Sequence, residues 1–222
     1  MNARPEPYKS TTPAGEFRYP KLNEYDEYKD QKKYKVDLVL TEDKADLFRE
    51  QLSEVYAEAE ERGNAEFVQL KPAMKKKFGG EVTMNPLGVE EYDDEDEETG
   101  RVIFKFKTNA YSVKGRLKKI AMFSPQGKRL NNVQVWGGTI GKVSFSAVPY
   151  FNNSNGQAGV TLYLNGVQIL ELVSGGAGRS AADHGFGAEE GYDEIEDGEA
   201  DDAGETDASD GFTNNEEDNP DF

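Results

Sequence analysis

The sequence predicts a mainly β protein, a small Greek-key barrel with one inserted α-helix and a disordered acidic C-terminal tail. Apolar and polar residues alternate in several short segments between residues 34 and 171, and this period of two is typical of half-buried strands. One segment near residue 50 has helical spacing instead. Beyond Val173 aliphatic residues almost disappear, so burial cannot offset the entropy of ordering the chain.

The strand candidates are short and are separated by turn residues. They are residues 34–40, 102–106, 120–123, 133–136, 143–151, 160–164 and 167–171. Within the last pair, Asn165–Gly166 predicts a tight hairpin turn. Five or six strands with one inserted helix is the count of an OB-like Greek-key barrel.

The segment after residue 40 predicts the helix. Thr41 is suited to cap it, and apolar residues recur at spacings of three and four from Ala45 to Ala59, until Gly63 ends the pattern. Residues 1–33 have no sustained period and predict an extended N-terminal arm. We therefore expect an arm at 1–33, a binding domain at 34–174 and a disordered acidic tail at 175–222.

Charge is distributed unevenly along the chain. Of the 43 acidic residues, 17 lie between Asp183 and Phe222, where there is no Lys or Arg, so 26 acidic residues remain against 26 basic ones. The run Glu90–Glu98, which we interpret as a solvated loop, holds 8 acidic residues and no basic one. The rest of the body then has an excess of +8, so a basic body carries an acidic arm.

Residue types exclude several chemistries. The absence of cysteine excludes disulfides, thiolate zinc sites and cysteine nucleophiles. The only histidine, His184, lies in the predicted disordered tail, where a general base would lack a rigid setting. Residues 137–142 depart from a phosphate loop because Trp136 stands in place of the first glycine, and residues 93–97 lack calcium-loop spacing. We expect no enzymatic activity, no cofactor and no metal site.

The sequence also carries no membrane or export signal that we recognise. No apolar run approaches the roughly 18 residues needed to span a bilayer. The N-terminus, with charged residues and prolines, lacks the apolar core of a secretory signal. We therefore expect a cytosolic protein.

Basic residues interleave with aromatic ones in the strand region. Such a mixture suits unpaired DNA, because bases stack on aromatic rings while the phosphates follow positive charge. The same mixture of residues is also typical of the solvent-exposed face of any sheet whose other face is buried. The candidate DNA-binding residues are Lys105, Lys107, Tyr111, Lys114, Arg116, Lys118, Lys119, Lys128, Arg129, Trp136, Lys142 and Tyr150.

The end of the chain, residues 216–222, reads EEDNPDF and resembles the acidic C-terminus closed by an aromatic residue of single-stranded-DNA-binding proteins from short-tailed bacteriophages. The segments VIFKFKTNA at 102–110, VWGGTIGKVSFSAVPYF at 135–151 and VTLYLNGVQILEL at 160–172 are similar too. The resemblance implies an OB-fold, homodimeric or cooperative binding of unpaired strands, strand annealing, and a role in DNA replication, recombination and repair in the cytoplasm of the infected host. It also implies that the tail contacts the phage DNA polymerase and helicase-primase, with Asp218, Asp221 and Phe222 as partner-binding residues.

The charge distribution predicts a mechanism for the acidic tail, and two alternative functions stay open. A tethered polyanion beside a basic groove is expected to compete with DNA for that groove. An acidic-tailed chaperone or DNA mimic that binds basic partners is the main alternative, favoured by the net charge of −17 and opposed by the basic body. A metal-dependent nuclease is a more distant one.

Overall fold

The computed structural model describes residues 6–131 and 133–173, which belong to one compact unit. The predicted disordered tail, with His184, Asp218, Asp221 and Phe222, lies outside these residues. The elements in chain order are β1 (Tyr8–Thr11), β2 (Gly15–Tyr28), β3 (Gln31–Thr41), α1 (Glu42–Gln51), α2 (Ser53–Val68), α3 (Pro72–Lys77), β4 (Thr83–Met84), β5 (Val89–Tyr92), β6 (Glu98–Asn109), β7 (Ala121–Phe123), β8 (Arg129–Leu130), β9 (Ile140–Asn152) and β10 (Gln157–Glu171).

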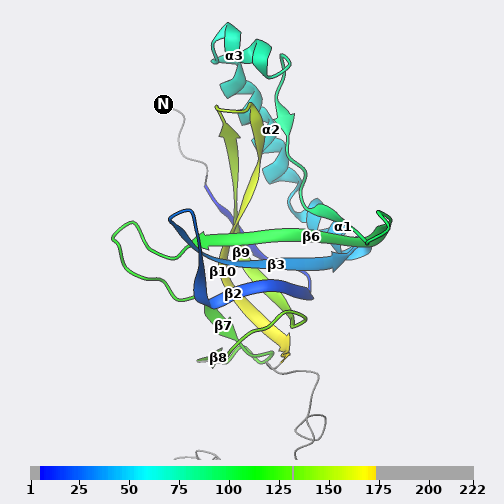
Figure 1. The fold of residues 1–222 in the computed structure, drawn as a ribbon, viewed down its shortest axis with the longest axis vertical. Helices are drawn as coiled ribbons and strands as arrows, with labels where there is room; N and C mark the ends of the chain where they lie inside the picture. The colour runs from blue at the N-terminus through cyan, green and yellow to red at the C-terminus, as the bar shows by residue number, and fades with distance from the viewer. Residues whose placement is uncertain (1–5, 132, 174–222) are drawn as a thin grey trace, which may run out of the picture. The chain divides into compact units, whose positions relative to one another are not determined.

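Five of these strands close into a barrel. The neighbours run in the order β9, β2, β3, β6, β10 and back to β9. All of these pairings are antiparallel except β6 with β10, which is parallel. In Figure 1 strands β2, β3 and β6 lie side by side across the long β9–β10 hairpin. The predicted OB-like, mainly β fold is confirmed.

The barrel interior is filled by large apolar side chains from every strand. Phe17, Val36, Phe104 and Phe145 are fully buried, and burying each such side chain contributes about 1.5–3 kcal/mol. Helix α1 contributes to the same core through Phe48, whose ring centroid lies 4.9 Å from that of Phe104 and 5.3 Å from that of Phe145. The alternation in the sequence therefore located the core correctly.

The helical insertion is longer than predicted. Instead of one helix that ends at Gly63, the described residues contain α1 and α2, separated at the buried Leu52, and the short α3. Gly63 lies inside α2, so it does not end the helix. A Cβ at Gly63 would come within 2.6 Å of the Ala158 Cβ. This glycine allows α2 to pack closely against β10.

Two strand expectations need correction. Residues 133–136 form no strand, and Asn165–Gly166 makes no hairpin turn, because β10 continues through it with a register shift. A Cβ at Gly166 would lie 2.9 Å from the Ala121 carbonyl oxygen, so this glycine marks a close approach of β7. The actual hairpin turn joins β9 to β10 at residues 153–156.

The N-terminal region also contributes more than an arm. Residues 15–28 form β2, which pairs with β3 and β9, so the barrel begins before Tyr34. The pairing of β2 with β3 has irregularities between Arg18 and Lys21 and again between Lys21 and Asp26. These irregularities interrupt the period of two by which a strand is identified. No helix among the described residues is long and apolar enough to cross a membrane.

Candidate nucleic-acid interface

The outer surface of β3 and β6, hereafter the β3–β6 face, carries cationic side chains from both strands. Val36 and Phe106 point into the core, and because strand residues alternate between faces, their neighbours point outward. On that outer side Lys35 lies opposite Lys107, and Asp37 lies opposite Lys105. Two predicted DNA-binding residues, Lys105 and Lys107, are thus exposed on one surface.

Cross-strand register extends this surface into a row. Lys21 of β2 lies opposite Lys35, which lies opposite Lys107, which in turn is paired with Tyr163 of β10. Strands are spaced by about 4.8 Å, so the row spans about 14 Å. Tyr163 is 41% exposed. We call these four residues the lysine row.

Sequence reasoning named only Lys107 of the lysine row. The signal for Lys35 and Tyr163 was present, because each stands between inward-facing apolar residues of a strand. Lys21 gave no such signal, since it lies at an irregularity of β2.

Two carboxylates moderate the charge of the β3–β6 face. Lys35 Nζ donates to Asp26 Oδ2 at 2.6 Å, and this hydrogen bond lowers the pKa of Asp26. Partial burial raises the pKa of Asp37, although Lys105, Lys35 and Arg18 lie near enough to oppose the shift. Among the described residues, neither Lys105 nor Lys107 makes an ion pair. Both remain available to phosphate groups.

A tyrosine cluster lies at one end of the face. The Tyr25 ring centroid lies 6.3 Å from that of Tyr34 and 6.1 Å from that of Tyr111, and Lys32 Nζ lies 5.5 Å from the Tyr25 centroid. The Tyr34 hydroxyl donates to the Lys118 carbonyl oxygen at 2.8 Å. The cluster thereby anchors the loop at residues 110–120.

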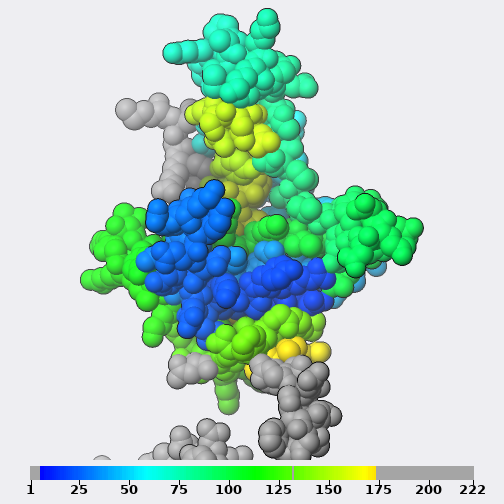
Figure 2. Space-filling view, viewed as in Figure 1, coloured from blue at the N-terminus to red at the C-terminus, as the bar shows by residue number. Residues whose placement is uncertain are grey.

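The 110–120 loop carries five of the predicted residues. Figure 2 shows it projecting as the green lobe on the left, beside strands β2 and β3 in blue. All five are exposed except Lys118, which is half-buried: Tyr111, Lys114, Arg116, Lys118 and Lys119. The structure therefore places an exposed ring and a group of cations where the β3–β6 face ends.

Tyr150 lies toward the opposite end. It lines a cavity of about 280 Å³ together with Lys105 and Lys107. Asn85 Nδ2 donates to the Tyr150 hydroxyl at 2.5 Å, which holds the half-buried ring in place. The structure thus brings this predicted residue to the β3–β6 face.

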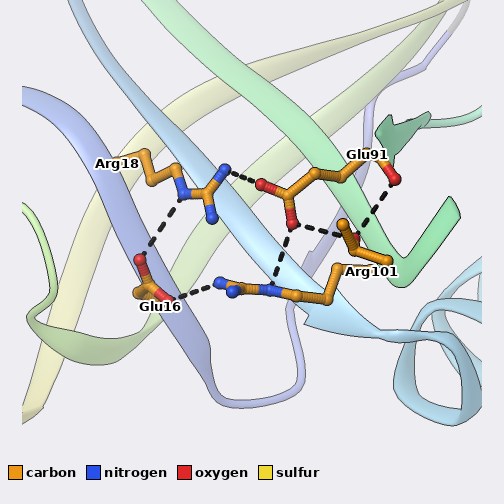
Figure 3. A network of polar contacts seen from close by, with 5 residues as sticks. Glu16, Arg18, Glu91 and Arg101 are labelled. Carbon is orange, nitrogen blue, oxygen red and sulfur yellow. Dashed lines mark hydrogen bonds and ion pairs between the residues drawn. The ribbon is translucent and has the colours of Figure 1, made fainter. Parts of the chain in front are cut away.

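An acidic hairpin closes this second end. Strands β5 and β6 pair around the acidic residues 93–97, so the expected solvated loop is the tip of a hairpin. Figure 3 shows how four charged side chains tie it to β2. Arg18 Nη1 donates to Glu91 Oε1, Arg101 Nη2 lies 2.5 Å from Glu16 Oε2, and Arg101 Nε lies 3.3 Å from Glu91 Oε2.

This charge network limits the open surface. Val39, opposite Glu16 of β2 and Ile103 of β6, is only 3% exposed although it belongs to the outer side of β3. In Figure 2 the hairpin projects to the right, away from the 110–120 loop. The open part of the face therefore extends from the tyrosine cluster to Lys105.

The remaining predicted residues lie elsewhere. Trp136 is 47% exposed in an irregular segment beside β2, and it lines a cavity together with Lys21 and Lys35 of the lysine row. Lys128 and Arg129 are exposed at the β7–β8 turn. Lys142 lines a different cavity, formed by residues of β1, β7, β9 and β10 together with Gly127, so the structure does not bring it to the β3–β6 face.

In the described part of the chain, no group of three or more His, Cys, Asp or Glu side chains is arranged to hold a metal ion.

Comparisons with known proteins found related sequences in bacteriophages. A family model described as "Single-stranded DNA-binding protein, Bacteriophage T7" matches residues 7–172. The single-stranded DNA-binding protein of Enterobacteria phage T3 is 29% identical over 175 residues, which cover 74% of this chain and 69% of the T3 protein.

The fold was also compared with solved structures. The crystal structure of gp2.5, a single-stranded DNA-binding protein encoded by bacteriophage T7, aligns with a TM-score of 0.57 and 24% identity, covering 78% of this chain and 96% of the T7 chain. The single-stranded DNA-binding protein of bacteriophage Enc34 in complex with ssDNA aligns with a TM-score of 0.49 and 12% identity over 74% of this chain and 86% of that one. The T7 alignment shows a shared fold.

Proposed function

Because the chain belongs to the family of the bacteriophage T7 single-stranded DNA-binding protein, we propose that it binds and protects single-stranded DNA during phage DNA replication and recombination. The lysine row is the observation that carries the proposal. It aligns three cations and one exposed aromatic ring across four neighbouring strands. In OB-folds the face of the second and third barrel strands binds oligonucleotides, and β3 and β6 hold those positions here.

The chemistry of the surface favours unpaired over paired DNA. The phosphates of both single-stranded and duplex DNA would be attracted to Lys21, Lys35 and Lys107. Only unpaired bases present their flat faces to rings such as Tyr163 or Tyr111, and each stacked base contributes about 1–3 kcal/mol. A binding role rather than catalysis follows from these groups. We assign the DNA contacts to the lysine row, Lys105, Tyr111, Tyr150 and the cations of the 110–120 loop, with Trp136 in the cavity beside them.

The acidic tail has two parts in this proposal. Its 17 acidic residues compete with DNA for the basic face, and its end, with Asp218, Asp221 and Phe222, recruits the phage DNA polymerase and helicase-primase. Homodimer formation and strand annealing, both implied by the family resemblance, complete it. The protein would act in the cytoplasm of the infected bacterium.

Fluorescence anisotropy with labelled single-stranded and duplex oligonucleotides tests the central claim. We expect tighter binding to the single strand, with a logarithmic salt slope of about −0.7 for each phosphate neutralised. Lys107→Gln is expected to weaken binding and to reduce that slope by about 0.7. Lys9→Gln, the same charge change at an exposed position of β1, is the matched control and is expected to leave both unchanged.

Two results would contradict the proposal. Equal affinity for single-stranded and duplex DNA would remove the role of base stacking. Tight binding of a basic protein with no binding of either DNA would favour an acidic-tailed chaperone or DNA mimic instead.

A further inference from the structure

A cavity beside the lysine row lies between β2 and the segment 134–138. Its volume is about 620 Å³, and its lining includes Tyr19, Leu22, Lys35 and Trp136. Cavities of about 300–1,000 Å³ are the size that small-molecule ligands occupy in proteins. Since Lys35 belongs both to the cavity and to the lysine row, the two surfaces are continuous.

Tyr19 reaches this cavity through an unusual backbone conformation. Its φ is +47°, a left-handed conformation that is uncommon for a residue other than glycine and costs on the order of 1–3 kcal/mol. It lies where the β2–β3 register shifts between Arg18 and Lys21. The side chain is 74% exposed, so core packing does not explain the strain. Strain of this kind often accompanies a ligand-binding role.

Trp136 is placed by a turn on the opposite wall. Thr139 N–H donates to the Trp136 carbonyl oxygen at 3.3 Å, and Gly138 N–H donates to the Phe17 carbonyl oxygen at 2.9 Å. Gly138 has φ +87°, which this turn requires and a side chain would disfavour. The turn fastens the segment to β2 while the indole remains 47% exposed. Because the turn fixes Trp136 while its indole stays exposed, the ring contributes little to the core and offers a surface on which a base can stack.

The charges around the cavity fit a nucleotide better than a free anion. Arg18 and Glu16, both in the lining, are already paired within the charge network that holds the acidic hairpin. Two cations lie toward the lysine row: Lys21, which makes no ion pair among the described residues, and Lys35, which also donates to Asp26 Oδ2 at 2.6 Å. Glu24 is an exposed acid nearby. A phosphate would therefore stay at Lys21 and Lys35, and the neutral base would enter beside the aromatic rings.

The wall also offers polar groups for a base edge. Asn23 Nδ2 donates to the Val133 carbonyl oxygen at 2.8 Å, whereas its buried Oδ1 has no hydrogen-bond partner among the described residues. Buried polar atoms are nearly always satisfied, so an unsatisfied one at a cavity wall suggests a missing donor. Nucleobases carry such donors: an exocyclic amino group in adenine, cytosine and guanine, and the N3–H group in thymine.

We propose that this cavity captures a nucleotide that turns off the β3–β6 face, with its base against Tyr19 and Trp136 and its phosphate at Lys21 and Lys35. The inference rests on the proposed binding of single-stranded DNA and adds a second place for a base beside the lysine row. A strand bound across the face would be bent at Lys35, because the acidic hairpin closes the path along β3.

The single tryptophan of the chain makes the test direct. The full-length protein is titrated with an oligothymidylate, and Trp136 emission and fluorescence anisotropy of a labelled oligonucleotide are recorded in parallel. We expect DNA to quench Trp136 and to protect it from iodide. Tyr19→Gly removes the ring but suits the positive φ, so it is expected to lower DNA affinity about 5- to 140-fold without lowering the melting temperature.

A control variant tests whether the loss of any exposed tyrosine lowers DNA affinity. Tyr92→Ala removes another exposed tyrosine, from β5 of the acidic hairpin, and is expected to leave affinity unchanged. If DNA binds normally while Trp136 emission, iodide access and the affinity of Tyr19→Gly are all unaltered, the cavity has no role and the proposed function stands. Absence of DNA binding by the unaltered protein would instead overturn the proposed function and this inference with it.

Discussion

Arg18 of β2 donates a hydrogen bond to Glu91 of β5, although strands β3 and β6 separate β2 from β5 in the sheet order, and this pair ties the acidic hairpin to the edge of the lysine row. Glu91 also accepts from Thr99 Oγ1 at 3.1 Å and lies 3.3 Å from Arg101 Nε. Only 14% of its side chain is exposed. The hairpin therefore owes its position to a carboxylate surrounded by two guanidinium groups.

Glu91→Gln is expected to loosen the hairpin and to strengthen DNA binding. The change removes the negative charge of Glu91, with which Arg18 and Arg101 pair. Both guanidinium groups then lie beside the lysine row with one fewer carboxylate partner. Faster amide hydrogen exchange over residues 89–100 and a higher affinity for single-stranded DNA are the expected results. Glu95→Gln, the same charge change at the exposed hairpin tip, is the control. Equal effects of the two variants would mean that net charge, not the network, matters.

Acidification is expected to destabilise the DNA-free protein through the same carboxylate, Glu91. The hydrogen bond from Arg18, more than any other factor, lowers the pKa of Glu91 in the folded state. A carboxyl group with a lowered pKa stabilises the fold above its ordinary pKa of about 4.3, and that stabilisation is lost as pH falls through the lowered value. The melting temperature of Glu91→Gln is therefore expected to fall less than that of the unaltered protein between about pH 5 and pH 3.

Asp37 provides a second pH-dependent prediction, with the opposite sign. Burial raises its pKa, so the folded state holds its proton to higher pH than the unfolded state does, and stability falls as pH rises through that interval. Its carboxylate also faces Lys105 across β3 and β6. The DNA affinity of the unaltered protein is expected to increase on acidification, as Asp37 takes up a proton. Asp37→Asn is expected to raise DNA affinity at neutral pH and to make this pH dependence weaker. A lower affinity of this variant would assign Asp37 a positioning role for Lys105 instead.

Core and surface aromatic residues are expected to respond differently to truncation. Phe104 and Phe145 are fully buried and both contact Phe48, so Phe104→Ala or Phe145→Ala is expected to cost about 3–5 kcal/mol of unfolding free energy. Trp136→Ala is expected to cost far less, because nearly half of the side chain is exposed. Chemical denaturation measures all three. Unfolding of Trp136→Ala comparable to that of the phenylalanine variants would make Trp136 a packing residue.

Sequence periodicity predicted the parts of the fold that depend on local pattern. The alternation around Val36 and Phe104 located the core and, by the same rule, the outward lysines of β6. It failed where a contact between distant segments decides the role of a residue. Gly63 interrupts no helix because Ala158 packs against it, and Gly166 ends no strand because β7 approaches it.

The positions of the candidate site residues in the fold were predictable to the same extent. Lys105 and Lys107 followed from alternation, whereas Lys21 and Tyr19 lie at an irregularity of β2 that removes the period of two. The network of Glu16, Arg18, Glu91 and Arg101 joins three strands, and no local pattern connects such positions. The separation of Lys142 from the β3–β6 face likewise depends on how the barrel closes, which residue type does not reveal.

The acidic tail yields the last prediction, which separates charge from specific contact. Removing residues 183–222 takes away 17 negative charges and no positive one, so the proposed competition for the lysine row would end. Affinity for single-stranded DNA is expected to rise, most at low salt, where screening is weakest and a tethered polyanion competes best. Phe222→Ala keeps every side-chain charge and is therefore expected to leave DNA affinity nearly unchanged while it weakens polymerase or helicase-primase binding, since an apolar anchor acts within a packed contact. Anisotropy titrations of both variants across a salt series make the comparison, and an affinity unchanged by truncation at every salt concentration would reduce the tail to a docking or solubilising segment.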